Sequence, residues 1–185
     1  MTSETEVLAN VVRHLERLGI PYMVTGSFAS SVHGKPRTTH DADIVIDPTV
    51  EALDQLVAGL AASGFYVDRA VAADALRTRR QFNVIETTTA FKVDLIVRKD
   101  RPFSREELAR RCRSDLAGVS AAVATPEDTV LSKLEWAKKG GGSERQIEDA
   151  RGVVEVRGAD LDREYVERWA VELGVLDLWR RITSA

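Results

Sequence analysis

The sequence predicts a mixed α/β core followed by a helical C-terminal segment. Up to about residue 125, short apolar runs typical of strands alternate with helix-length amphipathic segments. From residue 126 onward only helical periodicity remains. We therefore expect an α/β (α+β) fold, with a mixed β-sheet flanked by helices in residues 1–125 and a C-terminal helical extension in residues 126–185. A chain of 185 residues can bury a hydrophobic core of its own.

The first part of the chain shows alternating helix and strand patterns. In chain order we expect a helix over 6–18, a strand over 22–25, a short helix over 27–33, a strand over 43–47, a helix over 51–62 and a short strand over 65–67. Apolar residues at helical spacing, such as Val7, Val11 and Leu15, support the first helix. Thr49 is a residue type that caps helix N-termini, and Gly64 is typical of a helix end.

The second part contains one ambiguous stretch and then clearer signals. We expect a helical or irregular segment over 69–80, a β-hairpin of 82–87 with 91–97, a helix from Ser104 to about Leu116, a strand over 119–124, helices over 126–139 and 143–156, and one or two helices from 160 onward. Ser104 followed by Glu107 matches a capping box. Thr125 followed by Pro126 is a strong helix start.

Composition excludes several classes of protein. A single cysteine, Cys112, excludes an internal disulfide and a cysteine zinc cluster. The acidic N-terminus is unlike a signal peptide and no apolar run is long enough to cross a bilayer, so we expect a cytoplasmic protein without a membrane partner. The net charge is −3, yet residues 77–113 carry eleven Lys/Arg against five Asp/Glu. That basic middle is either a phosphate-backbone contact zone or a solvated face.

Two carboxylates, Asp41 and Asp43, stand two residues apart beside an apolar strand. Side chains at this spacing lie on the same face of a strand and would repel each other if both were charged and unpaired. A divalent cation removes the repulsion, and magnesium favours one or two carboxylates together with substrate phosphates. The alternative is a solvent-facing strand edge that happens to carry two acids.

Asp94 is a third carboxylate, placed between Val93 and Leu95 with its side chain on the opposite face of the strand from theirs. If this strand neighbours the first, three carboxylates could hold two metal ions roughly 3.5–4 Å apart and support an in-line displacement at phosphorus. The alternative is that Asp94 pairs with a nearby cation, and Lys92 is on the same face.

Gly26 and Ser27 form a turn that follows one strand and opens a helix. Backbone N–H groups at such a turn, the helix dipole and the serine hydroxyl are suited to bind a triphosphate. Ser27 could equally be a simple helix cap. Arg37 lies between this turn and the two carboxylates, where it could contact a phosphate through two N–H groups or form a structural ion pair.

Taken together, these segments resemble a known superfamily. A resemblance to the DNA-polymerase-β-like nucleotidyltransferases is carried by Val24–Ser27, Asp41–Val45 and Asp94. A closer resemblance, to the AbiEii-type toxin nucleotidyltransferases, is carried by Gly26–Ala29, Gly34–Asp43, Pro126–Ala137 and Glu148–Ala150. The resemblance covers roughly residues 20–155 of this chain.

The resemblance implies a nucleotidyltransferase fold and a role for each motif. Asp41 and Asp43 would hold magnesium, expected as two ions, and Asp94 would complete the metal site or help deprotonate the acceptor. The backbone of Gly26 and the hydroxyl of Ser27 would hold the triphosphate. By the same resemblance, the side chain of Lys133 would reach nucleotide phosphates, and Asp149 would orient or activate the acceptor.

The expected activity is therefore transfer of a nucleoside monophosphate from a nucleoside triphosphate to an acceptor hydroxyl. By resemblance the acceptor is the 3′ end of tRNA, and the protein is a toxin with an antitoxin partner. One alternative is transfer to a small molecule such as an aminoglycoside or lincosamide, which suits an acidic chain. Another is a module that only binds nucleotide or a partner protein, although such a module has no chemical need for Ser27 and three intact carboxylates.

Overall fold

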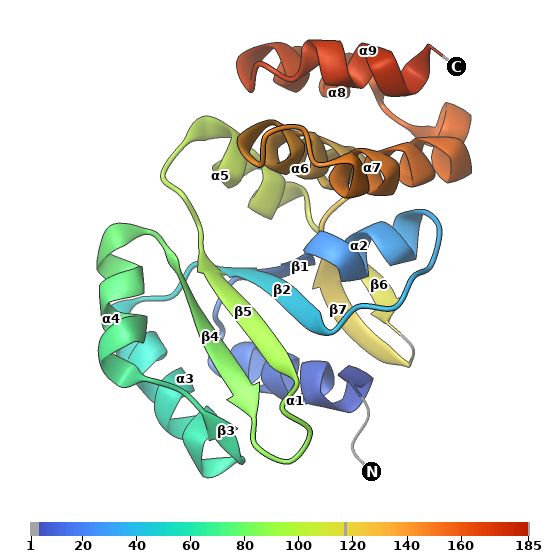
Figure 1. Ribbon diagram of the computed structural model, residues 1–185. Coiled ribbons are helices and arrows are strands. Elements are labelled where there is room, and N and C mark those ends of the chain that lie inside the picture. The colour runs from blue at the N-terminus through green and yellow to red at the C-terminus, as the bar shows by residue number, and fades with distance from the viewer. Residues whose placement is uncertain (1–3, 117, 185) are drawn as a thin grey trace. The chain divides into compact units, whose positions relative to one another are not determined.

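The computed structural model describes residues 4–116 and 118–184 (Figure 1). The helices are α1 (Glu4–Arg17), α2 (Gly26–His33), α3 (Val50–Ala62), α4 (Arg69–Thr78), α5 (Pro102–Arg110), α6 (Pro126–Lys139), α7 (Glu144–Arg157), α8 (Arg163–Glu172) and α9 (Leu176–Thr183). The strands are β1 (Tyr22–Thr25), β2 (Asp41–Ile46), β3 (Phe65–Tyr66), β4 (Gln81–Glu86), β5 (Lys92–Val97), β6 (Cys112–Leu116) and β7 (Val119–Val123). A 3₁₀ turn, Gly158–Asp160, follows α7.

The described strands form one seven-stranded mixed sheet in the order β3-β4-β5-β2-β1-β7-β6. β2 runs parallel to β5, and β1 runs parallel to β7. The pairs β3–β4, β4–β5 and β6–β7 are antiparallel. This confirms the predicted mixed sheet, including the hairpin of β4 with β5.

The chain divides into two compact units by its internal contacts. The first runs from α1 to Val24 and from Thr39 to Val123, and it contains the sheet. The second is made of Thr25–Thr38 and of the chain from Ala124 through α9. The segment that carries α2 therefore groups with the C-terminal helices, whereas the sequence alone placed it with the residues before 126.

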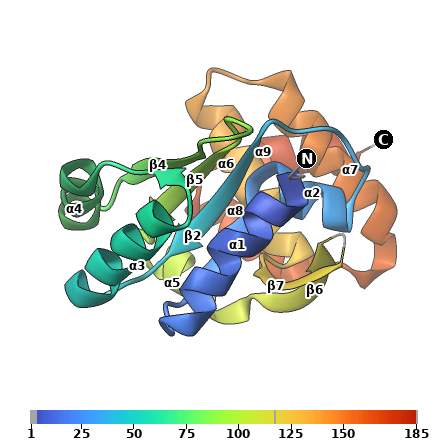
Figure 2. The ribbon, with the colours of Figure 1, turned by 90° about the horizontal axis from the view of Figure 1, so that it is seen from below.

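The first unit is built on the alternation of apolar and polar residues along its central strands. In β2 the side chains of Ala42, Ile44 and Ile46 are fully buried and alternate with partly exposed residues. Helices α1 and α3 contact each other and lie side by side along one face of the sheet (Figure 2). Thr49 caps α3 by accepting a hydrogen bond from the backbone N–H of Ala52, as its position predicts.

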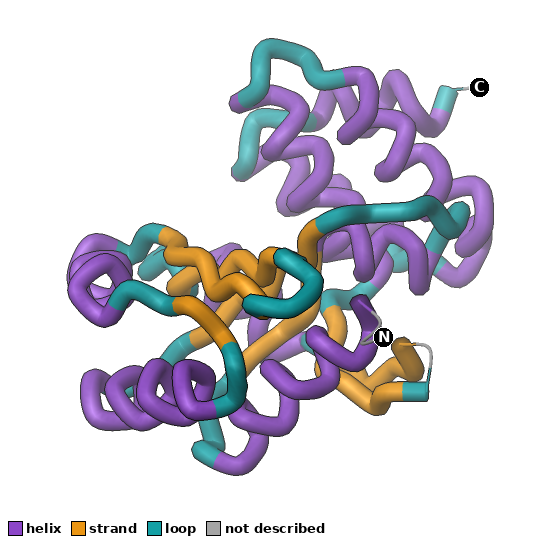
Figure 3. Tube along the Cα trace, turned by 60° about the horizontal axis from the view of Figure 1, so that its bottom comes forward, coloured by secondary structure: helices purple, strands orange, loops and turns teal. Residues whose placement is uncertain are grey.

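The second unit is helical, and Figure 3 shows its C-terminal helices joined by short connections. Helices α6 and α7 pack against each other, and α2 contacts both. The end of α2 lies very close to α7. A Cβ placed on Gly34 would lie only 2.8 Å from the backbone nitrogen of Val153. Glycine is thus required there for close packing. Thr125 caps α6 by accepting a hydrogen bond from the N–H of Asp128.

The helix predicted from Ser104 to Leu116 is wrong at both ends. Helix α5 begins at Pro102 and ends at Arg110, and its N-cap residue, Arg101, makes no side-chain cap hydrogen bond. Ser104 lies within the helix, where its hydroxyl accepts a hydrogen bond from Arg101. The following residues form β6, paired antiparallel with β7. Most residues of β6 are polar and exposed to solvent, so the segment lacks the apolar pattern of a typical strand. It is a strand because its backbone pairs with β7.

The ambiguous stretch 69–80 is largely helical. Asp68 caps α4 by accepting hydrogen bonds from the N–H groups of Ala70 and Val71, and Arg79 closes the helix in the left-handed conformation. Within the described parts of the chain, no helix has both the length and the apolar character needed to cross a membrane.

Candidate active site

Three carboxylates lie on one face of the central strands of the first unit. β2 and β5 are parallel neighbours, with Asp43 opposite Asp94 and Asp41 opposite Lys92. Paired residues on adjacent strands project to the same side of a sheet, and so do residues two apart on one strand. The predicted placement of Asp94 beside the first two carboxylates is therefore confirmed as a matter of register. On its other side, Asp94 is paired with Asn83 of β4.

Asp94 is the most enclosed of the three carboxylates, with only 6% of the residue exposed. Its Oδ2 atom accepts a hydrogen bond of 3.0 Å from Nζ of Lys92. Its Oδ1 atom is buried and has no hydrogen-bond partner among the described residues. A buried carboxylate oxygen without a partner is costly, so this atom is available to a cation or to a proton donor.

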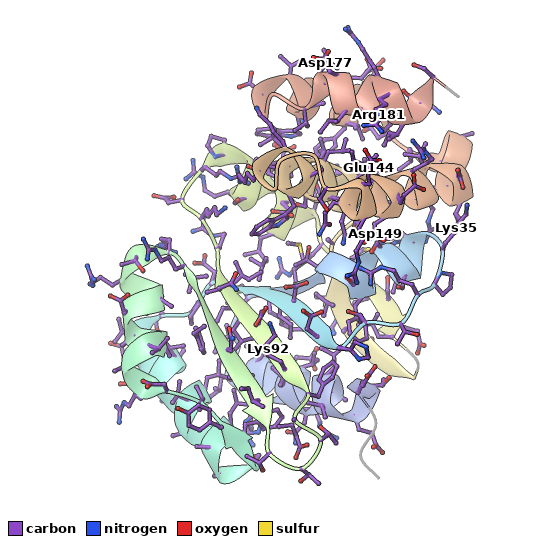
Figure 4. The ribbon with its side chains drawn as sticks, in the orientation of Figure 1. Lys35, Lys92, Glu144, Asp149, Asp177 and Arg181 are labelled. Carbon is purple, nitrogen blue, oxygen red and sulfur yellow. The ribbon has the colours of Figure 1, made fainter. Side chains whose placement is uncertain are left out.

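Lys92 provides the positive charge of this group, which we call the carboxylate cluster (Asp41, Asp43, Asp94 and Lys92). Its Nζ lies 3.0 Å from Asp94 and 3.9 Å from Oδ2 of Asp41. The hydrogen bond to Asp94 and the charges of all three carboxylates raise the pKa of Lys92 above its ordinary value. Figure 4 shows the Lys92 side chain on β5. The pairing of Asp94 with Lys92, which the sequence left as an alternative, is thus present.

Asp41 is held by a neighbour that the sequence interpretation missed. The buried hydroxyl of Thr39 donates to Oδ1 of Asp41 at 3.0 Å, and it also lies 3.1 Å from the backbone oxygen of that residue. The signal was available, because Thr39, Asp41 and Asp43 have the period-two spacing of a strand. Thr39 fixes the orientation of the more exposed carboxylate.

The donor set fits magnesium in chemical type, since hard divalent cations take carboxylate oxygens. The buried, unpartnered Oδ1 atom of Asp94 supports that fit. Within residues 4–116 and 118–184, however, no three His, Cys, Asp or Glu side chains come close enough together to surround a metal ion. Lys92 instead supplies the counter-charge between Asp41 and Asp94.

A second group of candidate residues lies in the helical unit, where α2 begins. Gly26 has φ +63, a left-handed conformation that favours glycine. Thr25 precedes the helix without a side-chain cap hydrogen bond. The buried hydroxyl of Ser27 accepts a hydrogen bond from Nη2 of Arg37. Ser27 therefore faces a cation rather than capping the helix.

Arg37 and Lys133 converge on Asp149, and we call these three residues with Ser27 the cation cluster. Arg37 donates through Nε to Oδ1 of Asp149 at 2.9 Å and through Nη2 to Oδ2 at 3.0 Å. Lys133 donates to Oδ2 at 2.7 Å. The side chains of Lys133 and Asp149 are 5% and 9% exposed, so this pair is buried. Figure 4 shows the position of Asp149 on α7.

The environment of Asp149 favours a permanent negative charge. Burial opposes ionisation, but the hydrogen bonds from Arg37 and Lys133 outweigh it and hold the pKa of Asp149 below its ordinary value of 3.8. A carboxylate whose pKa lies below 3.8 is a poor proton acceptor at neutral pH. Its geometry suits orientation of the two cations better than deprotonation of an acceptor.

The basic middle of the chain is largely engaged in ion pairs. Arg77 pairs with Asp74, and Arg105 pairs with Asp100. Arg79 and Arg98 both pair with Asp47. The solvated-face interpretation therefore describes these arginines better than a free phosphate-contact zone does.

The structure thus groups the predicted site residues into two clusters. Arg37 and Asp149 are 112 positions apart in the chain, and no local pattern could have indicated their pairing. The sequence indicates Lys92 as a partner of Asp94, on the same face of the strand, and does not indicate its contact with Asp41. That contact depends on the parallel pairing that sets Lys92 opposite Asp41.

Comparisons with known proteins give likeness in structure alone. No protein-family model matches the chain, and no curated protein matches its sequence. The crystal structure of ANT(2″)-Ia in complex with adenylyl-2″-tobramycin is similar with a TM-score of 0.62 and 16% identity, over 94% of this chain and 98% of that one. The solution structure of ANT(2″)-Ia gives 0.59 and 15%, over 98% and 99%.

A third solved structure gives a likeness of the same strength. The crystal structure of an antigenic nucleotidyltransferase-like protein from Paracoccidioides brasiliensis has a TM-score of 0.62 and 17% identity, over 97% of this chain and 91% of that one. Each likeness extends over nearly the whole of both chains. The chain therefore has a nucleotidyltransferase-like fold, a mixed seven-stranded sheet with helices and a helical C-terminal part.

Proposed function

We propose that the protein is a nucleotidyltransferase that transfers a nucleoside monophosphate from a nucleoside triphosphate to a hydroxyl group of a small molecule. The observation that carries the proposal is the register of Asp43 with Asp94 on adjacent parallel strands, beside Asp41, in a chain with this fold. A binding module would not need three carboxylates gathered on one sheet face, because their mutual repulsion costs stability.

In this proposal Asp41, Asp43 and Asp94 hold magnesium. Bound there, the metal would neutralise charge on the phosphates and make the α-phosphorus more electrophilic. Thr39 fixes Asp41 through its hydrogen bond to Oδ1. The buried Oδ1 atom of Asp94 is free to accept a proton, which makes Asp94 the candidate base.

The cation cluster binds the triphosphate. The backbone at Gly26 and the hydroxyl of Ser27 stand at the start of α2, where the helix dipole favours an anion. Lys133 and Arg37 supply two positive charges. Because Nε and Nη2 of Arg37 donate to Asp149 and Ser27, a phosphate would meet this side chain at Nη1. Asp149 holds both cations in place, so its role in catalysis is positioning.

The proposed step conserves atoms and charge. The acceptor oxygen forms a bond to the α-phosphorus while the bond from that phosphorus to the bridging oxygen breaks, and pyrophosphate leaves. The hydroxyl proton passes to Oδ1 of Asp94. Such in-line transfer depends mainly on positioning and on charge stabilisation.

Two observations favour a small acceptor over tRNA. ANT(2″)-Ia, which is similar over almost its whole length, has been crystallised with adenylyl-2″-tobramycin, an aminoglycoside that carries a nucleotide. In addition, the net charge of this chain is −3 and arginines of its basic middle are paired with acids, which is unfavourable for a polyanion. The similarity to AbiEii-type toxins makes tRNA the second acceptor to test.

The test is an acceptor screen. The protein is incubated with magnesium and each α-labelled nucleoside triphosphate in turn, together with a panel of aminoglycosides and lincosamides, total tRNA, or no acceptor. We expect label on a small molecule. Label on tRNA alone would replace this acceptor class with that of the toxins, and nucleotide binding without transfer to any acceptor would overturn the enzymatic assignment.

A further inference from the structure

The ammonium group of Lys92 contacts two of the three carboxylates of the cluster. Its Nζ lies 3.0 Å from Asp94 and 3.9 Å from Asp41, and the charge of Asp43 also acts on it. The same three side chains are those that the proposed function assigns to magnesium. The lysine therefore interacts with the oxygens that a metal ion would need.

We propose that Lys92 is an internal counter-ion of the carboxylate cluster, and that a divalent cation must compete with its ammonium group for Asp94 and Asp41. This inference rests on the proposed function, since it presupposes that the cluster binds metal. Beyond that function, the inference assigns to Lys92 a role in setting the affinity of the cluster for metal. Lys92 is a positioning residue, because it acts through the carboxylates and not on the substrate.

The burial of Asp94 explains why a counter-ion is built in. An ionised carboxylate that is 6% exposed is costly without a partner, and its neighbour Asp43 adds repulsion. Lys92 reduces this cost in the metal-free protein because the strand alternation places its side chain on the face of Asp94. The unpartnered Oδ1 of Asp94 shows that the compensation is incomplete.

The geometry of Lys92 also permits its release. Its side chain is 36% exposed, in contrast with 8% for Asp94, so the ammonium can move into water while the carboxylate stays in place. A lysine is a flexible point charge that is strongly hydrated when free. A doubly charged cation interacts more strongly with the cluster than a singly charged one, which provides the driving force for exchange.

The test measures metal binding without nucleotide or acceptor. Binding of Mn²⁺, as a stand-in for Mg²⁺, is followed by electron paramagnetic resonance and calorimetry in the wild type, Lys92→Met, Lys92→Arg and Asp43→Asn. We expect Lys92→Met to bind Mn²⁺ about tenfold more tightly than the wild type, which corresponds to about 1.4 kcal/mol. Lys92→Arg keeps the charge and is expected to stay near the wild-type affinity, and Asp43→Asn to lose binding.

Thermal unfolding separates competition from a purely structural ion pair. Without metal, Lys92→Met is expected to melt below the wild type, and added Mg²⁺ should raise its melting temperature more than that of the wild type. The matched control is Lys139→Met, which removes an exposed lysine paired with Glu135 at 2.6 Å and should leave the metal response unchanged.

The outcomes distinguish this inference from the function on which it rests. If the wild type binds Mn²⁺, Asp43→Asn does not, and Lys92→Met binds no more tightly, the counter-ion proposal is wrong while the metal site stands. If Lys92→Met is destabilised and metal does not restore its stability, Lys92 is only a structural partner of Asp94. If no variant and no wild-type sample binds Mn²⁺, both proposals fall.

Discussion

The two clusters of candidate residues are opposite in charge and alike in construction. In the sheet unit the ammonium group of Lys92 lies against two of three carboxylates and is influenced by the charge of the third. In the helical unit two cations, Arg37 and Lys133, share one carboxylate, Asp149. Each cluster therefore keeps an excess of one sign together with an internal counter-ion.

The difference between the clusters lies in burial. Asp149 and Lys133 are both enclosed, and the arginine binds Asp149 through two hydrogen bonds, so the cation cluster is held firmly. Lys92 is partly exposed and makes one short contact. The comparison indicates that the counter-ion of the carboxylate cluster is exchangeable, whereas that of the cation cluster belongs to the framework.

Loss of a carboxylate from the first cluster should remove activity and leave the fold intact. Asp43→Asn is expected to lower kcat/KM for nucleotidyl transfer by about a thousandfold, because a metal at phosphorus supplies several kcal/mol of charge stabilisation. The rate is measured with saturating magnesium, and circular dichroism reports the fold.

Asp47→Asn is the matched control for that variant. Asp47 directly follows β2 and pairs with Arg79 and Arg98, outside the cluster. Its transfer rate should remain within a few-fold of the wild type. Equal losses in both variants would mean that the effect of Asp43 is not specific to the cluster.

Loss of the carboxylate from the second cluster should instead lower stability. Asp149→Asn removes the carboxylate that accepts hydrogen bonds from Lys133 and Arg37, and we expect the free energy of unfolding to fall by about 3 kcal/mol. Urea denaturation measures it. Glu148→Gln, next in sequence and paired with Arg151 in a more exposed setting, should change stability by less than about 0.5 kcal/mol.

Acid provides an independent check on the same carboxylate. Because the pKa of Asp149 is lowered in the folded state, its contribution to stability is present above the ordinary value of 3.8 and is lost as pH falls through the lowered value. The stability difference between wild type and Asp149→Asn should therefore shrink below about pH 4. A difference that stays constant into strong acid would contradict the assignment of this carboxylate as an ionised counter-ion.

Each unit also contains a buried histidine, which gives a smaller effect at mildly acidic pH. Burial, with nearby arginine charges, lowers the pKa of His14 in α1 and of His33 in α2 below 6.5. His33 Nε2 lies 2.7 Å from the carbonyl oxygen of Ala124. A histidine with a lowered pKa stabilises fully above 6.5, and that contribution declines as pH falls from 6.5 toward the lowered value.

Unfolding free energies at several pH values between 7.5 and 5.5 would test both histidines. The wild type should lose stability on acidification, by at most about 1.4 kcal/mol per pH unit for each histidine. His14→Gln and His33→Gln should each show a shallower dependence. Parallel curves for wild type and variants would show that neither histidine is linked to folding.

Local signals in the sequence were sufficient to predict much of the fold. Thr49 and Thr125 cap the helices that they were expected to cap, and strand alternation placed Asp94 on the face of Asp43. In contrast, β6 was missed because its exposed, polar residues form a strand through pairing with β7, which no local pattern reveals.

The candidate site likewise has one part that local sequence signals predict and another that depends on packing between distant segments. Asp41 and Asp43 are close in sequence, so their shared face could be predicted from spacing. The pairing of Arg37 with Asp149 joins a loop after α2 to α7, and it depends on the packing of those helices. Packing between distant segments is therefore the part of the site that the sequence alone could not provide.

We propose that the protein transfers the α-phosphoryl group together with its nucleoside. The most direct measurement compares two samples of the same nucleoside triphosphate, one labelled at the α-phosphorus and one at the γ-phosphorus, in the presence of magnesium and a responsive acceptor. We predict that α-label appears on the acceptor and that γ-label appears only in pyrophosphate, in the wild type but not in Asp43→Asn. Label from the γ-position on the acceptor, or an unchanged rate in Asp43→Asn, would contradict the account.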